Sequence, residues 1–531
     1  MEFDYIVVGA GSAGCVLAAR LTEDPNVTVL LIEAGKKDHH PLVHMPAGFA
    51  NLIGEKTTWG WSTTPQQNLD QTVYWYPQGK ILGGGSSINA QVYTRGNRRD
   101  YEGWKERHGC KNWGYDDVLP YFKKAEDNET FCNDFHGIDG PLGVSDPISP
   151  LPISKAFIRA AQQVGIAHNK DFNGEQQQGI GLYQTTTRKA RRSSTASTYL
   201  KFAKNRQNLK TVSSQQVERL VLEGNKVIGV EVSNGNDKGR KKILCRREVI
   251  VSAGAIGSPR LLMHSGIGNG EDLGNLDIPV KHHLPGVGQN FHDHFDLYIV
   301  CECNADLTYD KHNGLFKKLS AGLQYIFYKT GPVTSNLCEA GGFWTIAENY
   351  DHPEIQFHLM LGSGINAKED KLENCGLTLN TAVMQPKSRG SVKLASNKLE
   401  VAPLIDPNFW GHPDDVKASI AGLKLGRKIL QQSAIARFLK KEHLPGSSVT
   451  SDDQIANCAD SFSKTDYHPV GTCKMGVDED AVVSPETLKV YGLEGLRICD
   501  SSIMPEVVSS NTNAPTIMIA EKGADLIRFA A

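Results

Sequence analysis

The stretch Tyr5-Ile6-Val7-Val8-Gly9-Ala10-Gly11-Ser12-Ala13-Gly14 decides the fold of this chain. Its first four residues are typical of a short buried parallel strand, and a Gly-x-Gly-x-x-Gly motif follows them directly. Gly9 permits a tight turn, Gly11 lets the backbone approach a pyrophosphate, and Gly14 lets the following helix pack closely on the sheet. The stretch therefore predicts a dinucleotide-binding turn.

The residues after the motif extend it into a unit of strand, helix and strand. A helix is predicted over residues 13–21, with its N-terminal N–H groups pointing at the phosphates of the ligand. Val27–Ile32 is the second strand, and the Glu33 carboxylate at its end can accept hydrogen bonds from both hydroxyls of an adenosine ribose. NAD and FAD both carry this ADP moiety, so the motif alone does not choose between them.

The composition is that of a globular protein with two domains. At 531 residues the chain exceeds one ordinary core, and its 40% hydrophobic and 22% charged residues are ordinary proportions. A net charge of -2 gives no overall attraction to nucleic acid, so we expect no nucleic-acid partner. We interpret the basic runs Arg188–Arg192 and Arg240–Arg247 as solvated surface.

Other sequence features concern the cellular compartment. The first residues run straight into a strand, which leaves no room for a signal peptide, and no apolar run is long enough to span a bilayer. Eleven cysteines without a CxxC pair fit reduced thiols better than a disulfide framework or a zinc site. We therefore expect a cytoplasmic protein without a metal site.

A second glycine cluster lies between Gly79 and Asn89 and contains three consecutive glycines, Gly83 to Gly85. Such a run indicates backbone pressed against a flat or charged ligand, with Ser86, Ser87 and Asn89 supplying side-chain hydrogen bonds.

Periodicity predicts further helices and strands along the chain. Helices are expected over residues 101–124, 154–164, 415–431 and 516–529, and a helix is expected to open at Ser258-Pro259. Strands are expected over residues 209–212, 219–222, 227–232, 249–251, 354–361, 377–384 and 496–500.

Four blocks of this sequence resemble the glucose-methanol-choline (GMC) oxidoreductases, a family of FAD enzymes that oxidise alcohols. The blocks are Gly9–Glu33, Gly79–Glu102, Gly254–Gly268, and the C-terminal pair His468–Thr472 with Asn511–Thr516. They occur in family order from end to end, so the resemblance covers essentially the whole chain.

Within the family, the chain is similar to the choline dehydrogenase-like branch, and most of all to bacterial alcohol dehydrogenases of alkane degradation. The stretches that carry this closer similarity are His44–Pro46, Thr64–Asn68, Thr334–Asn336, Glu339–Phe343 and Gln385–Gly390. Choline and L-sorbose dehydrogenases share much of the same framework.

The resemblance implies an α+β fold, with an α/β Rossmann-like FAD-binding domain and a substrate domain built on an antiparallel sheet flanked by helices. The FAD-binding domain is expected to comprise residues 1–155 and 206–295, joined by a C-terminal return over residues 466–531 that carries the catalytic pair. The substrate domain is expected to comprise residues 156–205 and 296–465.

The resemblance also implies the catalytic residues. His468 matches the catalytic base of the family, and imidazole suits that role because its pKa of about 6.5 leaves a usable basic fraction near neutrality. Asn511 matches the second catalytic position, where its amide can donate a hydrogen bond to a developing alkoxide.

The cofactor implied is FAD. The matching residues are Gly9, Gly11, Ser12, Ala13, Gly14, Glu33, Ala34, Leu82, Gly84, Gly85, Ser86, Asn89, Ala90, Val92, Val217, Ala253, Asp500, Ser501, Thr512, Asn513 and Thr516. Some relatives tether FAD through a histidine in the second glycine cluster, but Ile88 stands at that position here. The FAD is therefore expected to be non-covalent.

The function expected by resemblance is oxidation of primary, aliphatic alcohols to aldehydes by hydride transfer to flavin N5. The electrons are expected to pass to a quinone or another non-oxygen acceptor. The alternatives are a choline or L-sorbose dehydrogenase, a flavin-containing hydroxynitrile lyase, and a plain NAD-dependent dehydrogenase, the last suggested by the Gly-rich motif alone.

Two segments leave alternatives open. Glu339 with Phe343 and Trp344 could form a cage for the quaternary ammonium of choline, or could be ordinary core residues. Apolar residues from Leu315 to Phe327 recur at near-helical spacing among lysines, as in a helix that lies on a membrane surface. We favour instead a helix packed over the substrate cavity, and keep association with the inner face of the cytoplasmic membrane as the alternative. The oligomeric state stays open.

Overall fold

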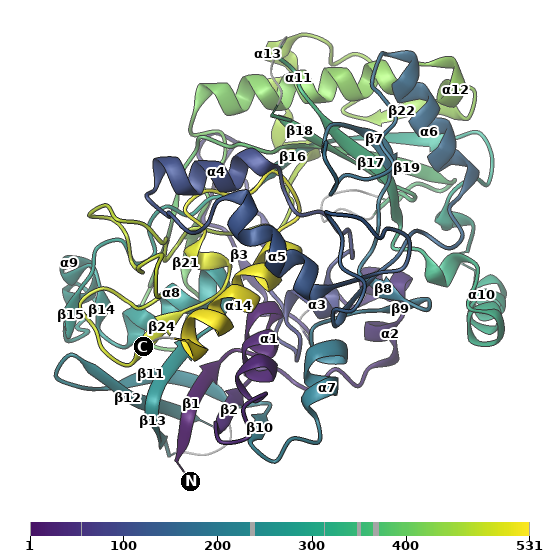
Figure 1. Cartoon of the computed structure of the whole chain (residues 1–531). Coiled ribbons are helices and arrows are strands. Elements are labelled where there is room, and N and C mark those ends of the chain that lie inside the picture. Colours follow the sequence, from purple (N-terminus) through teal and green to yellow (C-terminus); the bar gives the residue numbers. More distant parts are fainter. Residues whose placement is uncertain are drawn as a thin grey trace.

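The computed structural model describes residues 2–54, 56–233, 239–312, 314–347, 352–364 and 371–529. Within them the chain forms two seven-stranded sheets, which lie at opposite ends of the molecule in Figure 1.

The first sheet is mainly parallel and contains the strand that leads into the Gly-rich motif. Its order is β10-β2-β1-β13-β12-β11, with β24 paired to β13. The strands are β1 (Phe3–Val8), β2 (Val29–Ile32), β10 (Leu209–Val212), β11 (Gln216–Glu223), β12 (Lys226–Ser233), β13 (Lys241–Val251) and β24 (Leu496–Ile498). β1 pairs in parallel with both β2 and β13, which is the core of a dinucleotide-binding sheet.

Two helices from opposite ends of the chain pack side by side against this sheet (Figure 1). α1 (Ser12–Leu21) follows the Gly-rich motif, and α14 (Asn513–Arg528) is the last helix of the chain. Arg20 on α1 forms an ion pair at 2.8 Å with Glu521 on α14, whose side chain is fully buried. Because a buried carboxylate is costly without a partner, this pair fixes the two helices against each other.

The second sheet is antiparallel. Its order is β22-β16-β19-β18-β17-β7, with β23 paired to β16. The strands are β7 (Gly179–Leu182), β16 (Phe295–Cys303), β17 (Cys338–Trp344), β18 (Ile355–Met360), β19 (Gly376–Val383), β22 (Leu439–Leu444) and β23 (Ser463–Thr465). The helices α6 (Pro152–Gln163) and α11 (Pro413–Leu430) share a buried core with this sheet. The predicted fold class is confirmed.

The two sheets draw on the chain ranges assigned above to the two domains. The strands of the first sheet fall within residues 1–155, 206–295 and 466–531. Those of the second sheet fall within 156–205 and 296–465, except that β16 starts at Phe295. The domain boundaries themselves stay a prediction.

Shorter elements connect these layers. The helices are α2 (Pro41–His44), α3 (Gly85–Ile88), α4 (Arg98–Arg107), α5 (Tyr115–Ala125), α7 (Lys201–Ala203), α8 (Gly254–His264), α9 (Gly270–Gly274), α10 (Leu315–Tyr328), α12 (Ser433–Ala436) and α13 (Asp452–Asn457). Short 3-10 helices are η1 (Pro46–Asn51), η3 (Tyr309–His312), η4 (Pro332–Thr334), η5 (Ala459–Phe462) and η6 (Ser501–Ile503), and η2 (Ala196–Leu200) is a short π-helix. Two-stranded pairs are β3 (Trp61–Ser62) with β4 (Trp75–Tyr76), β5 (Glu126–Asn128) with β6 (Leu142–Val144), β8 (Thr187–Arg188) with β9 (Arg191–Arg192), β14 (Ile267–Gly268) with β15 (His282–His283), and β20 (Ser391–Lys393) with β21 (Leu404–Asp406).

Most predicted elements coincide with observed ones, but the single helix over residues 101–124 is wrong. The structure has two helices there, α4 and α5. Gly109 between them has φ +68°, in the region that favours glycine, and Asp117 caps the start of α5 by accepting the N–H of Gly114.

The helix predicted to open at Ser258-Pro259 is also wrong, because α8 starts at Gly254 and Pro259 lies inside it. Proline has no N–H to donate to the carbonyl four residues earlier, which belongs to Ala255. The Thr472 hydroxyl donates to that carbonyl instead, at 2.5 Å. A distant threonine therefore makes the internal proline tolerable.

For residues 315–327 the favoured interpretation is a helix whose apolar residues pack over the substrate cavity. The helix is present, but that position of its apolar side chains is wrong. The helix α10 does line the cavity described below, but through Lys318, Ala321 and Gly322. Leu315, Phe316 and the other large apolar residues of this helix are exposed.

All eleven cysteines are free, as expected for reduced thiols. Among the described residues, no helix combines the length and the apolar character needed to cross a bilayer.

The contact between Thr472 and α8 gives a stability prediction. Thr472→Val keeps the shape of the fully buried side chain but leaves the Ala255 carbonyl without this donor, which costs about 1–3 kcal/mol. We expect the variant to melt at a lower temperature than the parent, whereas Thr472→Ser, which keeps the hydroxyl, should lose less. Equal melting temperatures for the valine variant and the parent would contradict this role.

Candidate active site

A cavity of about 1010 Å³ runs from the carboxyl ends of β1 and β2 to the second sheet. Val8, Ile32 and Glu33 line one end, and His358 and Met360 of β18 line the other. A position at the carboxyl ends of parallel strands is where open α/β sheets bind their ligands.

The three glycines of the N-terminal motif have different geometric roles at this cavity. Gly9 has φ +94°, and a Cβ there would lie 2.5 Å from the Ser252 carbonyl oxygen. A Cβ on Gly14 would lie 1.9 Å from the Gly9 carbonyl oxygen, so only glycine allows α1 to pack this closely. A Cβ on Gly11 would meet nothing within 4 Å, which leaves open space for a pyrophosphate.

Most of the residues predicted to bind the cofactor line this cavity. They are Gly9, Gly11, Ser12, Ala13, Glu33, Ala34, Gly84, Gly85, Asn89, Ala90, Val92, Val217, Ala253, Asp500, Ser501, Thr512, Asn513 and Thr516. Among the described residues, Gly14, Leu82 and Ser86 are not part of the lining. The Ser86 hydroxyl donates to the Gly83 carbonyl at 2.6 Å, and it accepts the N–H of Thr195 at 3.1 Å, so it braces the second glycine cluster from behind.

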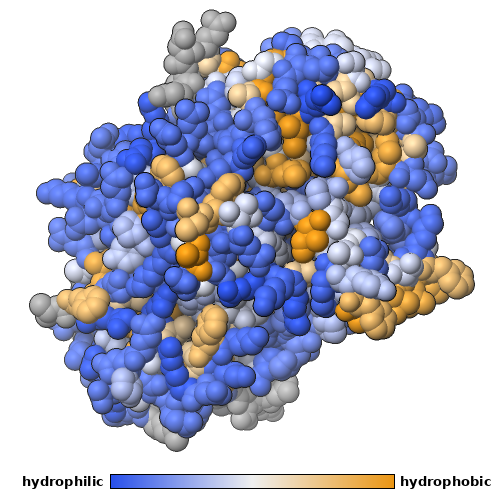
Figure 2. All heavy atoms as spheres, turned by 45° about the vertical axis from the view of Figure 1, so that its right-hand side comes forward, coloured by the Kyte–Doolittle hydropathy of each residue, from blue (hydrophilic) through white to orange (hydrophobic). Residues whose placement is uncertain are grey.

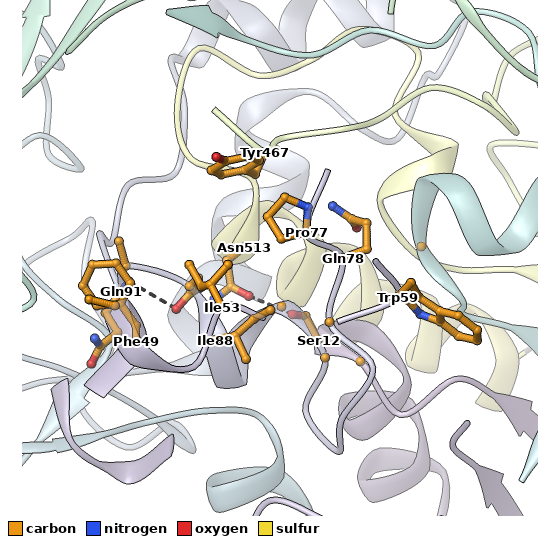
Figure 3. Close-up of a pocket in the computed structure, with 18 of the residues that line it drawn as sticks. Ser12, Phe49, Ile53, Trp59, Pro77, Gln78, Ile88, Gln91, Tyr467 and Asn513 are labelled. Atoms are coloured by element: carbon orange, nitrogen blue, oxygen red, sulfur yellow. Dashed lines mark hydrogen bonds between the residues drawn. The ribbon is translucent and has the colours of Figure 1, made fainter. Parts of the chain in front are cut away.

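Two helix N-termini face the middle of the cavity. Ser12 opens α1 and Asn513 opens α14, and the Ser12 hydroxyl donates to the Asn513 side-chain oxygen at 2.8 Å (Figure 3). The Asn513 Nδ2 group is buried and has no hydrogen-bond partner among the described residues. Helix N-termini and a buried unpaired amide donor together suit an anionic or carbonyl-rich ligand.

Two buried carboxylates flank this region. Glu33 accepts the backbone N–H groups of Ala10 at 2.8 Å and Gly35 at 2.7 Å. Burial raises the pKa of Glu33 to about 7, although those two N–H groups lower it. Burial likewise raises the pKa of Asp500, which accepts from the Gly254 N–H and the Ser258 hydroxyl.

His468 lies at the second-sheet side of the cavity, three residues after the end of β23. Its backbone N–H donates to Asp293 at 2.7 Å, and the same carboxylate accepts the hydroxyls of Tyr76 and Thr465. The preceding residue, Tyr467, has φ +62°, a strained value for a non-glycine residue. The backbone at His468 is therefore held rigidly.

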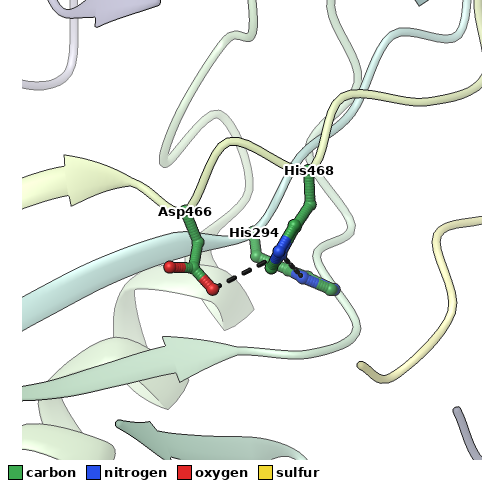
Figure 4. A group of neighbouring side chains, drawn as sticks. All are labelled: His294, Asp466 and His468. Carbon is green, nitrogen blue, oxygen red and sulfur yellow. Dashed lines mark hydrogen bonds and ion pairs between the residues drawn. The ribbon is translucent and has the colours of Figure 1, made fainter. Parts of the chain in front are cut away.

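The hydrogen bonds of His294 assign the proton on His468 (Figure 4). His294 Nε2 lies 3.2 Å from the Met384 carbonyl oxygen, which can only accept, so Nε2 carries the proton of this neutral ring. Its Nδ1 is then an acceptor, and it lies 3.0 Å from His468 Nδ1, which must donate. We therefore assign the His468 proton to Nδ1, which leaves the Nε2 lone pair available to accept a hydrogen bond.

Asn511 faces that lone pair. Its side-chain oxygen accepts from the Thr94 hydroxyl at 3.0 Å and from the Gln356 amide at 3.1 Å, which fixes the orientation of the amide. Its Nδ2 group consequently points at His468 Nε2, 3.2 Å away. The cavity thus presents a base and an amide donor within hydrogen-bond reach of each other.

Charges behind the histidine adjust its basicity. Burial lowers the pKa of His468 to about 4, and the Asp466 carboxylate, 3.3 Å from Nδ1, opposes that shift. Although burial raises the pKa of Asp466, the charge of Lys464 holds it below its ordinary value. Lys464 lies 3.0 Å from Asp466. Burial lowers the pKa of His294 to about 3, so that ring is neutral.

Several residues that surround the predicted catalytic pair were not predicted from the sequence, namely Thr94, His294, Gln356, His358, Lys464 and Asp466. A signal existed for some of them. Gln356 and His358 alternate with apolar residues in β18, so both face the same side of the sheet. Asp466 lies two residues before His468. Nothing local to Thr94 or His294 indicates that they reach the same site.

His294, Asp466 and His468 each offer one donor atom, and these atoms lie within 4.8 Å of one another. This is close enough to hold a cation, but the assigned hydrogen bonds use the same atoms. The expectation of no metal site stays a prediction.

Comparison with known proteins identifies the family. Two models of the GMC oxidoreductase family match residues 3–296 and 386–520. The chain therefore belongs to the GMC oxidoreductases, and FAD is its cofactor. This agrees with the open Gly11 turn and the two helix N-termini at the cavity.

Individual relatives extend over the whole chain. An alcohol dehydrogenase [acceptor] of Pseudomonas putida is 43% identical over 99% of this chain and 95% of its own length. The mitochondrial choline dehydrogenase of Mus musculus is also 43% identical, over 99% of this chain and 89% of its own length. A solved FAD-dependent oxidoreductase from Chaetomium thermophilum superposes with a TM-score of 0.92 and 26% identity, covering 99% of both chains. Sequence identity therefore does not separate the alcohol and choline branches.

The electrostatics of His468 give a pH prediction. The base is active when neutral, so kcat/KM for an alcohol should rise with pH through the pKa of His468, which lies below 6.5, and level off above it. Asp466→Asn removes the charge that raises this pKa, so the acidic limb should move to lower pH. The plateau rate should also fall, because the base is weaker. The measurement is the pH profile of kcat/KM for both proteins, and an unmoved limb would contradict the role of Asp466.

Proposed function

We propose that this protein oxidises primary aliphatic alcohols to aldehydes and passes the electrons to a quinone or another non-oxygen acceptor. The observation that supports the reaction type is the unprotonated Nε2 of His468, which accepts from the Asn511 amide in the cavity that also contains the Gly-rich turn.

The substrate hydroxyl would bind between these two groups. His468 Nε2 accepts the hydroxyl proton, while the Asn511 Nδ2 group donates to the developing alkoxide. Bound FAD supplies the acceptor for the hydride that leaves the carbon. Thr94 and Gln356 hold the amide of Asn511 so that its donor side, rather than its acceptor side, faces the oxygen.

Groups next to His468 Nδ1 stabilise the ring after it takes up the proton. Once both ring nitrogens are protonated, Nδ1–H still donates to His294 and faces the Asp466 carboxylate. Lys464 keeps that carboxylate ionised. The site therefore holds a weak base in the resting state and offers a counter-charge when the base is protonated.

The proposed substrate class rests on Glu339, the carboxylate that could have formed part of a choline cage. Glu339 is buried, and four donors occupy its two oxygens. They are the N–H of Leu151, at 2.8 Å, and the hydroxyls of Ser154, Ser335 and Tyr309, at 2.8, 2.8 and 2.5 Å. Among the described residues that line the cavity, neither Glu339 nor Phe343 nor Trp344 appears.

The lining near β18 is apolar instead. Phe49, Ile53, Leu337, Cys338 and Met360 belong to one packed cluster and all line the cavity; Figure 3 shows Phe49 and Ile53 beside Ile88. Met360 follows His358 and Gln356 on the same face of β18. This lobe, which continues from the catalytic pair, suits an alkyl chain better than a quaternary ammonium ion.

The proposal includes non-covalent FAD, because the Ile88 side chain lines the cavity at the position of the tethering histidine and cannot form that bond. It also includes a quinone-type acceptor, supported by the resemblance to acceptor-dependent alcohol dehydrogenases such as that of Pseudomonas putida.

His468→Ala tests the reaction type. We expect the rate of flavin reduction by an alcohol, followed without oxygen by loss of the flavin absorbance, to fall by about 10²–10⁴-fold. Bound FAD should be retained, and acid precipitation should release it from both proteins. His168→Ala is the control, because His168 is exposed. Reduction of His468→Ala at the parental rate would refute the assignment.

A matched pair of substrates tests the substrate class. Choline and 3,3-dimethylbutan-1-ol have nearly the same shape, but only choline is charged. We expect a higher kcat/KM for the neutral alcohol, and for linear primary alcohols a gain of about fourfold per added methylene until the lobe is full. A preference for choline would instead assign the protein to the choline dehydrogenases.

A further inference from the structure

The helix α10 presents an apolar face to solvent. In Figure 2 it forms a hydrophobic projection at the lower right. The exposed fractions of its large apolar residues are Leu315 79%, Phe316 86%, Leu319 61%, Leu323 47%, Ile326 57% and Phe327 73%. Contiguous exposure of this kind is unusual for a surface that contacts only water.

The orientation of the helix explains why this face is free. At about 100° per residue, the six side chains fall on one stripe about 120° wide. The opposite side carries Ala321 and Tyr325, the two buried residues of α10. The Tyr325 hydroxyl donates to the Ala190 carbonyl oxygen at 3.0 Å, which ties the back of the helix to the turn between β8 and β9.

Basic residues surround the apolar stripe. Lys317 and Lys318 lie on the helix, Lys329 ends it, and Lys189 and Arg191 are exposed on the turn that holds Tyr325. The fourteen residues of α10 include no aspartate or glutamate. An apolar stripe bordered by cations is the pattern of a helix that lies in the interface of an anionic bilayer.

We propose that α10 docks this protein on a membrane surface that contains anionic phospholipid, with Phe316 and Phe327 inserted among the acyl chains. A second copy of the chain is a poorer occupant. Two such faces brought together would place lysines against lysines, with no carboxylate on either helix to offset them.

The docked orientation has a consequence for the cavity. Lys318, Ala321 and Gly322, away from the apolar stripe of α10, line the cavity. Docking through the outward side therefore places this part of the cavity wall beside the bilayer. This consequence rests on the proposed function. Alcohols dissolved in lipid and a quinone-type acceptor would then enter the cavity from the membrane rather than from water.

The test is sedimentation of the FAD-bound protein with vesicles. We expect it to pellet with vesicles of phosphatidylcholine and phosphatidylglycerol, less with phosphatidylcholine alone, and less as salt is raised. Phe316→Glu should lower the partition coefficient by at least about tenfold, because it replaces a buried phenyl with a charge. Phe202→Glu is the matched control, since Phe202 is 63% exposed on α7, outside α10, and should bind as the parent does.

Three results would overturn the proposal. The parent protein could fail to pellet with the anionic vesicles, or Phe316→Glu could bind as well as Phe202→Glu. The third is a dimer in analytical ultracentrifugation that Phe316→Glu abolishes, without any vesicle binding by the parent. Flavin reduction by a water-soluble alcohol should be the same in parent and Phe316→Glu, so failure of docking and failure of the proposed reaction are separate outcomes.

Discussion

The structure depends on the return of the C-terminal segment to the Gly-rich turn at the start of the chain. β24 adds to the parallel sheet beside β13, and α14 packs against α1 through the buried pair of Arg20 and Glu521. From the end of β24 to the first residue of α14, the chain presents Asp500, Asn511 and Asn513 to the cavity. The dinucleotide site and one member of the proposed catalytic pair are therefore completed by a single segment, whose position is set by packing on the first sheet.

His468, the other member of the proposed pair, lies beside the second sheet. There, burial is the main influence on its pKa. Taking His468 out of water makes it a weak base that is neutral at rest. The compensating charges of Asp466 and Lys464 lie on the Nδ1 side of the ring, away from the Nε2 atom that faces Asn511. Because His294 can only accept from His468, the tautomer is fixed before any substrate arrives. Basicity and proton position are thus set by groups that have no need to touch the alcohol.

Local pattern predicted the parts of the fold that local physics decides. The Gly-rich turn, β10 and the last helix follow from periodicity and glycine placement, because those features depend on neighbours in sequence. Pro259 inside α8 could not be anticipated, since the hydroxyl that makes it tolerable comes from Thr472. Thr94 and Gln356 could not be predicted for the same reason, because Asn511, to which both donate, is more than a hundred residues away in sequence. The periodicity of α10 identified the helix but not the direction of its apolar face, which depends on Tyr325 and its contact with Ala190.

The position of β24 in the parallel sheet also constrains how the protein can be made. Until residues 496–498 leave the ribosome, β13 has an unpaired edge and α1 lacks the helix that covers it. Exposed strand edges and apolar helix faces are the surfaces through which nascent chains aggregate. The dinucleotide turn is synthesised first, whereas β24 and α14, which pack beside it, come from residues 496–528. We therefore expect cofactor loading to follow synthesis of residues 496–528, because a chain without them lacks one side of the FAD site.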